Sequence, residues 1–268
     1  MKSVVIVAFD MDGTLVDAQG GIHPQDVRVL TERRDVVWIP CSGRPLHAVR
    51  RAFDRHGVCL DQSLPFPMVL QNGSELYLPG ERLLRQHTFP LDVQSRILEA
   101  GLRSPDVYLS MFHIGPVDEI WPTPFSRRML ERFDLLAAPY QPQHPPRRYS
   151  KFMAMAEDAA RLADFAQSLP ADGMALSFSL AQVLEMNPPG VDKRTGLQQV
   201  LAALQLPVDR LYVAGDGGND LPLFELSSNS FAPSHALPQV LTQARHTIDR
   251  AEEGILSPIL RLAAAGES

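Results

Sequence analysis

The sequence predicts an α/β protein built on a parallel sheet, and two observations indicate this. The run Val4 to Phe9 is apolar throughout, which is typical of a strand covered on both faces in a parallel sheet. Three further strand-like runs are each followed by a polar cluster. Ligands of such sheets bind beyond the carboxyl ends of the strands, so the residues after each run are the first candidates for a site.

The first polar cluster holds two carboxylates, Asp10 and Asp12, directly after the first run. Strand side chains repeat with a period of two, so both acids can lean the same way. Two anionic groups would then crowd together unless a cation or a shared proton relieves them. The pair Asp12-Gly13 would also suit an ordinary turn that closes a strand.

The second cluster follows the run Val36 to Pro40 and contains Ser42, Gly43 and Arg44. A hydroxyl beside a glycine, whose bare backbone N–H can approach an anion, is typical of phosphate binding. Arg44 has two interpretations, since it could clasp a substrate or pair with a carboxylate of the core.

The third cluster contains Lys193, at the start of a helical pattern over 197–204 where the helix dipole favours anions. The fourth follows the run Leu211 to Ala214 and is rich in glycine and oxygen donors. Oxygen donors are the ligands that Mg²⁺ prefers. These donors are Asp216, Asn219 and Asp220.

Taken in order, the clusters resemble the four motifs of haloacid dehalogenase (HAD) superfamily phosphatases, which are DxDGT, a Ser or Thr, a Lys, and GDxxND. The resemblance covers residues 1–77 and 188–268. It implies a Rossmann-like core, Mg²⁺ as cofactor, and hydrolysis of a phosphate monoester through an aspartyl-phosphate intermediate.

The resemblance also implies a role for each motif residue. Asp10 is the nucleophile, Asp12 is the general acid and base, and Lys193 is the third catalytic residue. Asp10, the backbone carbonyl of Asp12, and Asp216 are the implied Mg²⁺ ligands, and Asp220 supports them. The implied phosphate-binding residues are Ser42, Gly43, Arg44, Lys193 and Asn219.

Spacing predicts where a second domain is inserted. Asp10 and Ser42 are 32 residues apart, which suffices for one helix and a returning strand, whereas Ser42 and Lys193 are 151 apart. This layout resembles the Cof-like subfamily, whose cap is of type IIB. We therefore expect a HAD core at 1–77 and 188–268, with an inserted α+β cap at 78–187 that selects the substrate.

Within the expected cap, helical and strand-like patterns alternate, which indicates a helix-backed and largely antiparallel sheet. The helical patterns lie at 93–102 and 159–169, and the strand-like runs at 107–112, 152–155, 176–178 and 183–186. A proline-rich loop at 139–146 precedes a basic cluster that could touch an anionic substrate or form a solvated surface. The cluster consists of Arg147, Arg148 and Lys151.

Composition limits the partners. The chain has 268 residues, 45% of them hydrophobic, and a net charge of −6, so it has no overall field for nucleic acid or an anionic membrane. The partner that fits this composition best is a small phosphorylated metabolite, whose negative charge would be met by positive side chains at the site. Without a signal-like or membrane-spanning segment, we expect a cytoplasmic protein, monomeric or homodimeric. Cys41 and Cys59 are expected to be reduced thiols, with Cys41 buried at a strand end.

Two alternative functions stay open, and the first of them could use the same motifs. A phosphomutase would release little free phosphate and would need a bisphosphorylated activator. A non-catalytic sugar-phosphate sensor would not need both acids of the first motif. The identity of the leaving group stays open between sugar phosphates, phosphorylated cofactors and pyrimidine phosphates.

Overall fold

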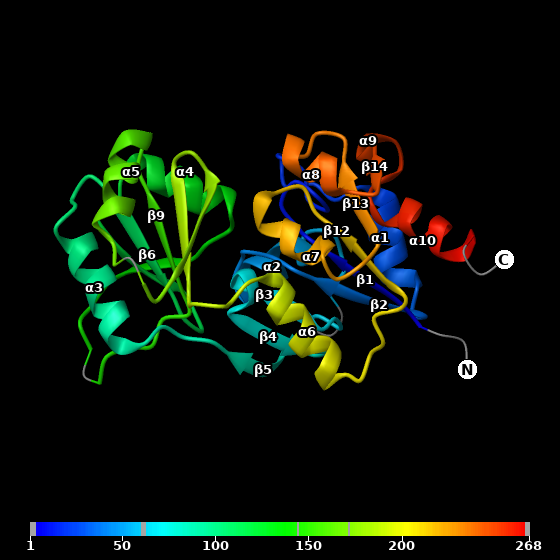
Figure 1. The fold of residues 1–268 in the computed structure, drawn as a ribbon, viewed down its shortest axis with the longest axis horizontal. Coiled ribbons are helices and arrows are strands. Elements are labelled where there is room, and N and C mark those ends of the chain that lie inside the picture. The colour runs from blue at the N-terminus through cyan, green and yellow to red at the C-terminus, as the bar shows by residue number, and fades with distance from the viewer. Residues whose placement is uncertain (1–3, 60–62, 144, 171, 266–268) are drawn as a thin grey trace. The chain divides into compact units, whose positions relative to one another are not determined.

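The computed structural model of the chain describes residues 4–59, 63–143, 145–170 and 172–265. The chain divides into two compact units, and Figure 1 labels their elements. Unit 1 comprises residues 1–43, 50–85 and 192–268, and unit 2 comprises residues 44–49 and 86–191.

Unit 1 is built on a five-stranded sheet in the order β14-β13-β12-β1-β2. Every neighbouring pair of these strands is parallel, which confirms the predicted sheet. The strands are β1 (Val5–Phe9), β2 (Val36–Pro40), β12 (Leu211–Ala214), β13 (Asn229–Pro233) and β14 (His246–Ile248). A parallel bridge between Cys41 and Val69 connects this sheet to a second, three-stranded one. That sheet contains β3 (Met68–Leu70), β4 (Glu75–Leu78) and β5 (Arg82–Gln86).

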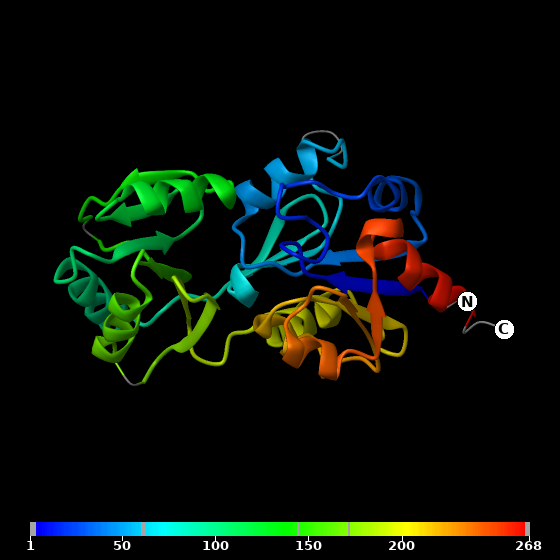
Figure 2. The same cartoon turned by 90° about the horizontal axis from the view of Figure 1, so that it is seen from above.

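Helices cover both faces of the parallel sheet, as strands that are apolar on both sides require. Figure 2 shows α1 (blue) and α10 (red) on one face, and α6, α7 and α8 (yellow to orange) on the other. The helical pattern predicted after Lys193 is α6, whose Leu197 and Val200 pack with Ile6 and Ala8 of β1. The helices and short turns are α1 (Pro24–Glu32), α2 (Leu46–Asp54), η1 (Gln71–Gly73), α6 (Lys193–Ala203), η2 (Gly218–Asp220), α7 (Leu221–Phe224), α8 (Pro238–Gln243), α9 (Arg250–Glu253) and α10 (Leu256–Ala265).

Unit 2 is a six-stranded sheet in the order β10-β11-β9-β6-β7-β8. The pair β7–β8 is parallel and the other pairs are antiparallel, so the predicted helix-backed, largely antiparallel sheet is confirmed. The strands are β6 (Tyr108–Phe112), β7 (Val117–Ile120), β8 (Ala137–Pro139), β9 (Lys151–Met155), β10 (Ala175–Leu180) and β11 (Val183–Asn187).

The two faces of this sheet carry different helices because side chains alternate along each strand. On one face, Leu109 and Phe152 belong to a cluster that includes side chains of α3 (Leu91–Leu102) and α5 (Ala159–Ser168). On the other, Tyr108 and Met153 share a cluster with Met129 and Leu130 of α4 (Pro124–Arg132).

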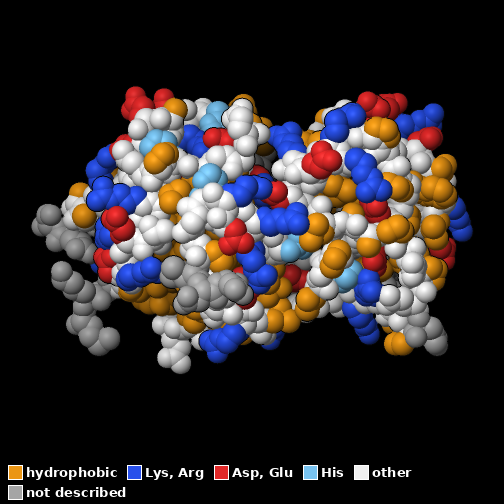
Figure 3. Space-filling view, turned by 180° about the vertical axis from the view of Figure 1, so that it is seen from behind, with side chains coloured by type: hydrophobic (Ala, Val, Ile, Leu, Met, Phe, Trp, Pro, Cys, Tyr) orange, Lys and Arg blue, Asp and Glu red, His pale blue; other side chains and the backbone are white. Residues whose placement is uncertain are grey.

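The surface carries charges of both signs. Figure 3 shows Lys and Arg side chains interspersed with Asp and Glu over the face in view. Among the helices in the described part of the chain, none combines the length and apolarity needed to cross a bilayer.

Candidate active site

The first and last acidic motifs meet because their strands are neighbours in the sheet. Phe9 of β1 pairs with Ala214 of β12, and Asp10 N donates to the carbonyl of Ala214 at 2.9 Å. Parallel strands end at the same edge, so Asp10 and the loop after β12 lie together, as the sequence predicted.

Lys193 reaches these acids from the first position of α6. Asp192 caps the helix by accepting from Thr195 N at 2.7 Å. The Lys193 side chain is fully buried, and its Nζ donates to Asp10 Oδ1 at 2.5 Å and to Asp220 Oδ1 at 2.6 Å. One ammonium therefore links the carboxylates of the first and last motifs.

Asp216 is held beside this group by the turn that follows β1. Thr14 Oγ1 donates to Asp216 Oδ1 at 2.9 Å. Gly13 has φ +85°, and a Cβ there would lie 2.2 Å from Asp216 Oδ2, so only glycine fits. The other oxygen of Asp220, Oδ2, accepts from the backbone N–H groups of Asp216 and Gly217 at 3.0 Å each, which fixes the loop.

The site holds more carboxylate than its lysine balances. Oxygens of Asp10, Asp216 and Asp220 lie within 4.8 Å of one another. Burial raises the pKa of Asp10 well above its usual range; the Lys193 ammonium opposes this shift, and the carboxylates of Asp220 and Asp216 add to it. Burial and the Asp220 carboxylate raise the pKa of Asp216 to about 6.

Lys193 is an ammonium in this setting. Burial alone would lower the pKa of Lys193, but the carboxylates of Asp10 and Asp220 outweigh burial and hold it above its ordinary value. Three carboxylates around one ammonium leave negative charge that a further cation would neutralise. The donors are all oxygens, and hard cations such as Mg²⁺ prefer oxygen ligands, so the residues fit a divalent metal.

The predicted phosphate-binding residues Ser42 and Asn219 are linked by Asn72, which sequence reasoning treated only as part of a turn. Asn72 N donates to Ser42 O at 3.0 Å, and Asn219 Nδ2 donates to Asn72 Oδ1 at 3.3 Å. Asn72 has φ 56°, a left-handed conformation that asparagine tolerates better than most residues. The signal that could have marked it is the Asn-Gly pair.

The remaining members of these motifs lie as follows. Ser42 is buried, and its N donates to Val69 O at 2.8 Å. Asp12 is half-buried in the turn after β1, where it forms an isolated bridge with Val16. Gly43 follows Ser42 at the carboxyl end of β2. Cys41 is buried as expected, and burial raises the pKa of its thiol.

Arg44 pairs with a carboxylate of unit 2. It belongs to unit 2, is 5% exposed, and its Nη1 donates to Asp134 Oδ2 at 3.0 Å in the same unit. The structure thus contains an ion pair of Arg44, with Asp134 as the carboxylate.

The predicted basic cluster of unit 2 does not act as one group. Arg147 donates to both oxygens of Asp118 at 2.8 and 2.9 Å. Lys151 is buried and donates to Glu185 Oε1 at 2.9 Å, whereas Arg148 is exposed. Arg148 is thus the member of the cluster whose side chain lies at the surface.

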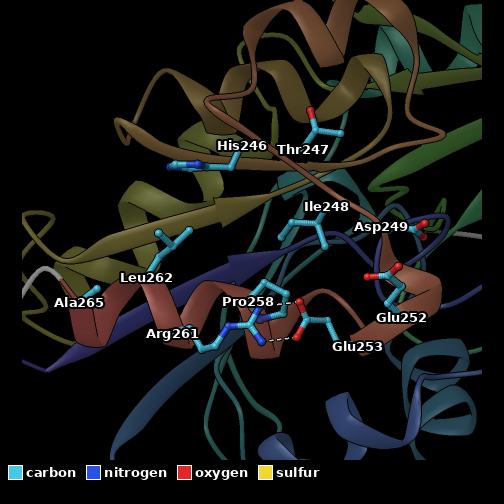
Figure 4. Close-up of a pocket in the computed structure, with 10 residues that line it drawn as sticks. All are labelled: His246, Thr247, Ile248, Asp249, Glu252, Glu253, Pro258, Arg261, Leu262 and Ala265. Atoms are coloured by element: carbon cyan, nitrogen blue, oxygen red, sulfur yellow. Dashed lines mark hydrogen bonds and ion pairs between the residues drawn. The ribbon is translucent and has the colours of Figure 1, made fainter.

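A separate hollow in unit 1 has a volume of about 490 Å³ and contains none of the predicted site residues. Figure 4 shows it between β14 and the helices α9 and α10, where Arg261 pairs with Glu253. The candidate active site is therefore the acid cluster at the strand ends rather than this hollow.

Known proteins resemble this chain over most of its length. A family model of haloacid dehalogenase-like hydrolases matches residues 7–259. A hydrolase of Schizosaccharomyces pombe is 23% identical over 278 residues, covering 97% of this chain and 90% of that protein. HMP-PP phosphatase of Serratia proteamaculans is 25% identical over 245 residues, covering 88% of this chain and 85% of that protein.

Solved structures share the fold at low sequence identity. A haloacid dehalogenase-like hydrolase from Bacteroides thetaiotaomicron has a TM-score of 0.84 at 18% identity, covering 97% of this chain and 100% of that one. A sugar phosphatase of HAD subclass IIB has a TM-score of 0.78 at 14% identity, covering 97% of this chain and 99% of that one. The chain belongs to the haloacid dehalogenase-like hydrolases, and the predicted fold with a subclass IIB cap is confirmed.

Proposed function

We propose that the protein is a Mg²⁺-dependent phosphatase that hydrolyses a phosphate monoester of a small metabolite through an aspartyl phosphate on Asp10. One observation carries the proposal: the buried Lys193 ammonium lies between Asp10 and Asp220, with Asp216 beside them. Such a site suits phosphoryl transfer, whose catalysis rests on positioning and on neutralising oxygen charge.

In the proposed reaction, a carboxylate oxygen of Asp10 attacks phosphorus in line, and the bond from phosphorus to the leaving oxygen breaks. Asp12 gives its proton to that oxygen, which leaves as an alcohol. Asp12 then takes a proton from water, whose oxygen attacks phosphorus and breaks the bond to Asp10. Inorganic phosphate is released, and both acids return to their starting states.

Other residues hold the phosphoryl group and the metal. Lys193, Ser42, Gly43 and Asn219 would contact the phosphoryl oxygens, and Asp220 keeps Lys193 in place. Asp10, the carbonyl of Asp12, and Asp216 would hold Mg²⁺, which supplies positive charge that offsets repulsion between the nucleophile and the phosphate.

We further propose that unit 2, which takes in most of the cap expected at 78–187, selects the substrate. Two relatives support a phosphorylated substrate, since one is named an HMP-PP phosphatase and the other a sugar phosphatase. In the basic cluster, the exposed Arg148 is the residue we propose to meet a distal anion of the substrate. Arg147 and Lys151 are engaged by Asp118 and Glu185.

The test is phosphate release from a panel of phosphorylated metabolites, p-nitrophenyl phosphate and acetyl phosphate, with and without Mg²⁺. We expect release by the wild type in Mg²⁺ and none by Asp10→Asn. Isomerisation without free phosphate, dependent on a bisphosphorylated activator, would instead identify a phosphomutase. Binding without any turnover of the panel would identify a sensor.

A further inference from the structure

The nucleophile turn, by which we mean residues 11–16, is closed by its own backbone. Gly13 N donates to Val16 O at 2.8 Å, and Val16 N donates to Met11 O at 2.7 Å. These bonds set the size of the turn and use neither the carbonyl of Gly13 nor that of Leu15, which both contact side chains from elsewhere in the fold.

Both partners come from the far end of the chain. His235 Nε2 lies 2.9 Å from Gly13 O, across 222 residues of sequence. Arg250 Nη2 donates to Leu15 O at 3.0 Å, across 235 residues. A carbonyl oxygen only accepts, so Nε2 of His235 carries the proton in this contact.

The contact of His235 falls where the turn is least restrained. Contact with Asp216 requires glycine at position 13, and glycine restrains its own backbone least of all residues. The peptide that carries Gly13 O also carries the N–H of Thr14, whose hydroxyl holds Asp216. A hydrogen bond at this carbonyl therefore restrains the orientation of the Gly13–Thr14 peptide, which directly follows the peptide that carries the Asp12 carbonyl.

The loop that carries His235 also touches the second acidic loop. Leu237 N donates to Asp216 O at 3.1 Å. The segment 234–237, which follows β13, thus holds the loops of both Asp12 and Asp216 through hydrogen bonds. The ring of His235 is exposed, so the contribution of His235 is this hydrogen bond rather than core packing.

We propose that His235 is a positioning residue for the reaction proposed above, on which this inference rests. Its Nε2–H orients the Gly13 peptide, and through it the Asp12 carbonyl and the Thr14 contact to Asp216. Arg250 keeps the turn folded when the imidazole is removed, so loss of His235 changes the geometry of the turn without unfolding it.

The chain offers a matched control. His56 Nε2 lies 3.2 Å from the carbonyl of Gly20, another glycine with positive φ in unit 1, outside the nucleophile turn. The experiment compares His235→Ala, His235→Gln and His56→Ala with the wild type. It measures kcat and KM for the best substrate of the panel, Mn²⁺ affinity by electron paramagnetic resonance, and Tm.

We expect His235→Ala to lower kcat about three- to ten-fold, the range that one hydrogen bond supplies, with KM nearly unchanged. Mn²⁺ affinity should fall several-fold. His235→Gln, whose amide can donate to the same carbonyl, should recover at least half of the lost kcat, and His56→Ala should change neither quantity.

Equal effects of His235→Ala and His56→Ala would overturn the proposal, as would a His235→Gln variant no better than His235→Ala. Failure of the proposed function is separately visible, because the wild type would then release no phosphate. In that case the Mn²⁺ affinities still decide whether His235 positions the acid loops.

Discussion

Two buried lysines, one in each unit, have different surroundings. Lys193 in unit 1 contacts the carboxylates of Asp10 and Asp220, and a third carboxylate lies beside them. Lys151 in unit 2 pairs with Glu185 at 2.9 Å, and its Nζ lies 5.1 Å from the ring centroid of Phe112. Burying a charge costs stability unless it is paired.

The difference lies in the balance of charge. The pair in unit 2 matches one ammonium with one carboxylate, beside an aromatic ring. The group in unit 1 has an excess of carboxylate, which suits a site that binds a cation and a phosphoryl group. We therefore interpret Lys193 as part of the chemistry and Lys151 as part of the framework.

The largest expected effect on activity comes from neutralising Asp10, a carboxylate partner of Lys193. The matched change at Glu185, the carboxylate partner of Lys151, should have almost no effect on activity. Asp10→Asn should lower kcat by about 10⁴ or more while the protein stays folded, because it removes the proposed nucleophile. Glu185→Gln is the matched change in unit 2 and should leave activity per folded molecule within about two-fold of the wild type, since Glu185 takes no part in the proposed chemistry. Rates are measured by phosphate release, with circular dichroism to follow folding. An Asp10→Asn rate above about a tenth of wild type would exclude covalent catalysis by Asp10.

Removal of the metal should abolish turnover, because the proposed metal site is the carboxylate-rich group of unit 1. EDTA should abolish turnover, and Mg²⁺ should restore it. Ca²⁺ should bind yet support little activity, because it takes more oxygen ligands at longer distances and loosens the in-line geometry. Initial rates after dialysis against each ion measure this, and full activity after exhaustive chelation would refute the metal assignment.

The sequence predicted those site residues that stand next to a recognisable strand or helix pattern. Asp10, Asp216 and Lys193 each follow a strand-like run or begin a helical pattern, so their meeting at one edge follows from the geometry of a parallel sheet. Asn72 and His235 escaped prediction, because their contacts join segments 147 and 222 residues apart. Such contacts leave no periodic pattern.

The sequence analysis also did not predict three elements of unit 2, namely β7, α4 and β8. β7 places Asp118 and Glu119 in a buried strand, where an apolar pattern would be expected. Asp118 pairs with Arg147, which lies 29 residues further along the chain, and Glu119 pairs with Arg127 of the following helix α4. Local composition alone therefore hides this strand, and with it the helix α4 and the strand β8 that follow.

A smaller effect should follow from breaking the balanced pair. Lys151→Met should lower the free energy of unfolding by about 3–5 kcal/mol, because the Glu185 carboxylate stays buried while its ion pair with Lys151 is lost. The double variant Lys151→Met, Glu185→Leu should recover much of this loss. Urea unfolding measures both. A raised KM with unchanged stability in Lys151→Met would instead assign Lys151 to substrate binding.

The smallest expected effect is the pH dependence of the rise in Tm that Mg²⁺ causes. The pKa of Asp216 is raised to about 6 in the folded protein, so the folded state holds an extra proton between the ordinary pKa and that value. Without metal, the Asp216 carboxyl lowers the free energy of unfolding as the pH rises from its ordinary pKa through about 6. Mg²⁺ binds the ionised form, so the rise in Tm on adding Mg²⁺ should be larger at pH 7.5 than at pH 5. An equal rise at both pH values would show that the metal binds elsewhere.

The excess of carboxylate in unit 1 is tested most directly by counting bound metal. Electron paramagnetic resonance titration with Mn²⁺ should find one site per molecule in the wild type and in Glu185→Gln, and a loss of at least ten-fold in affinity in Asp216→Asn. Equal Mn²⁺ affinity in the wild type and Asp216→Asn would contradict the account, because the carboxylate beside Lys193 would then hold no cation.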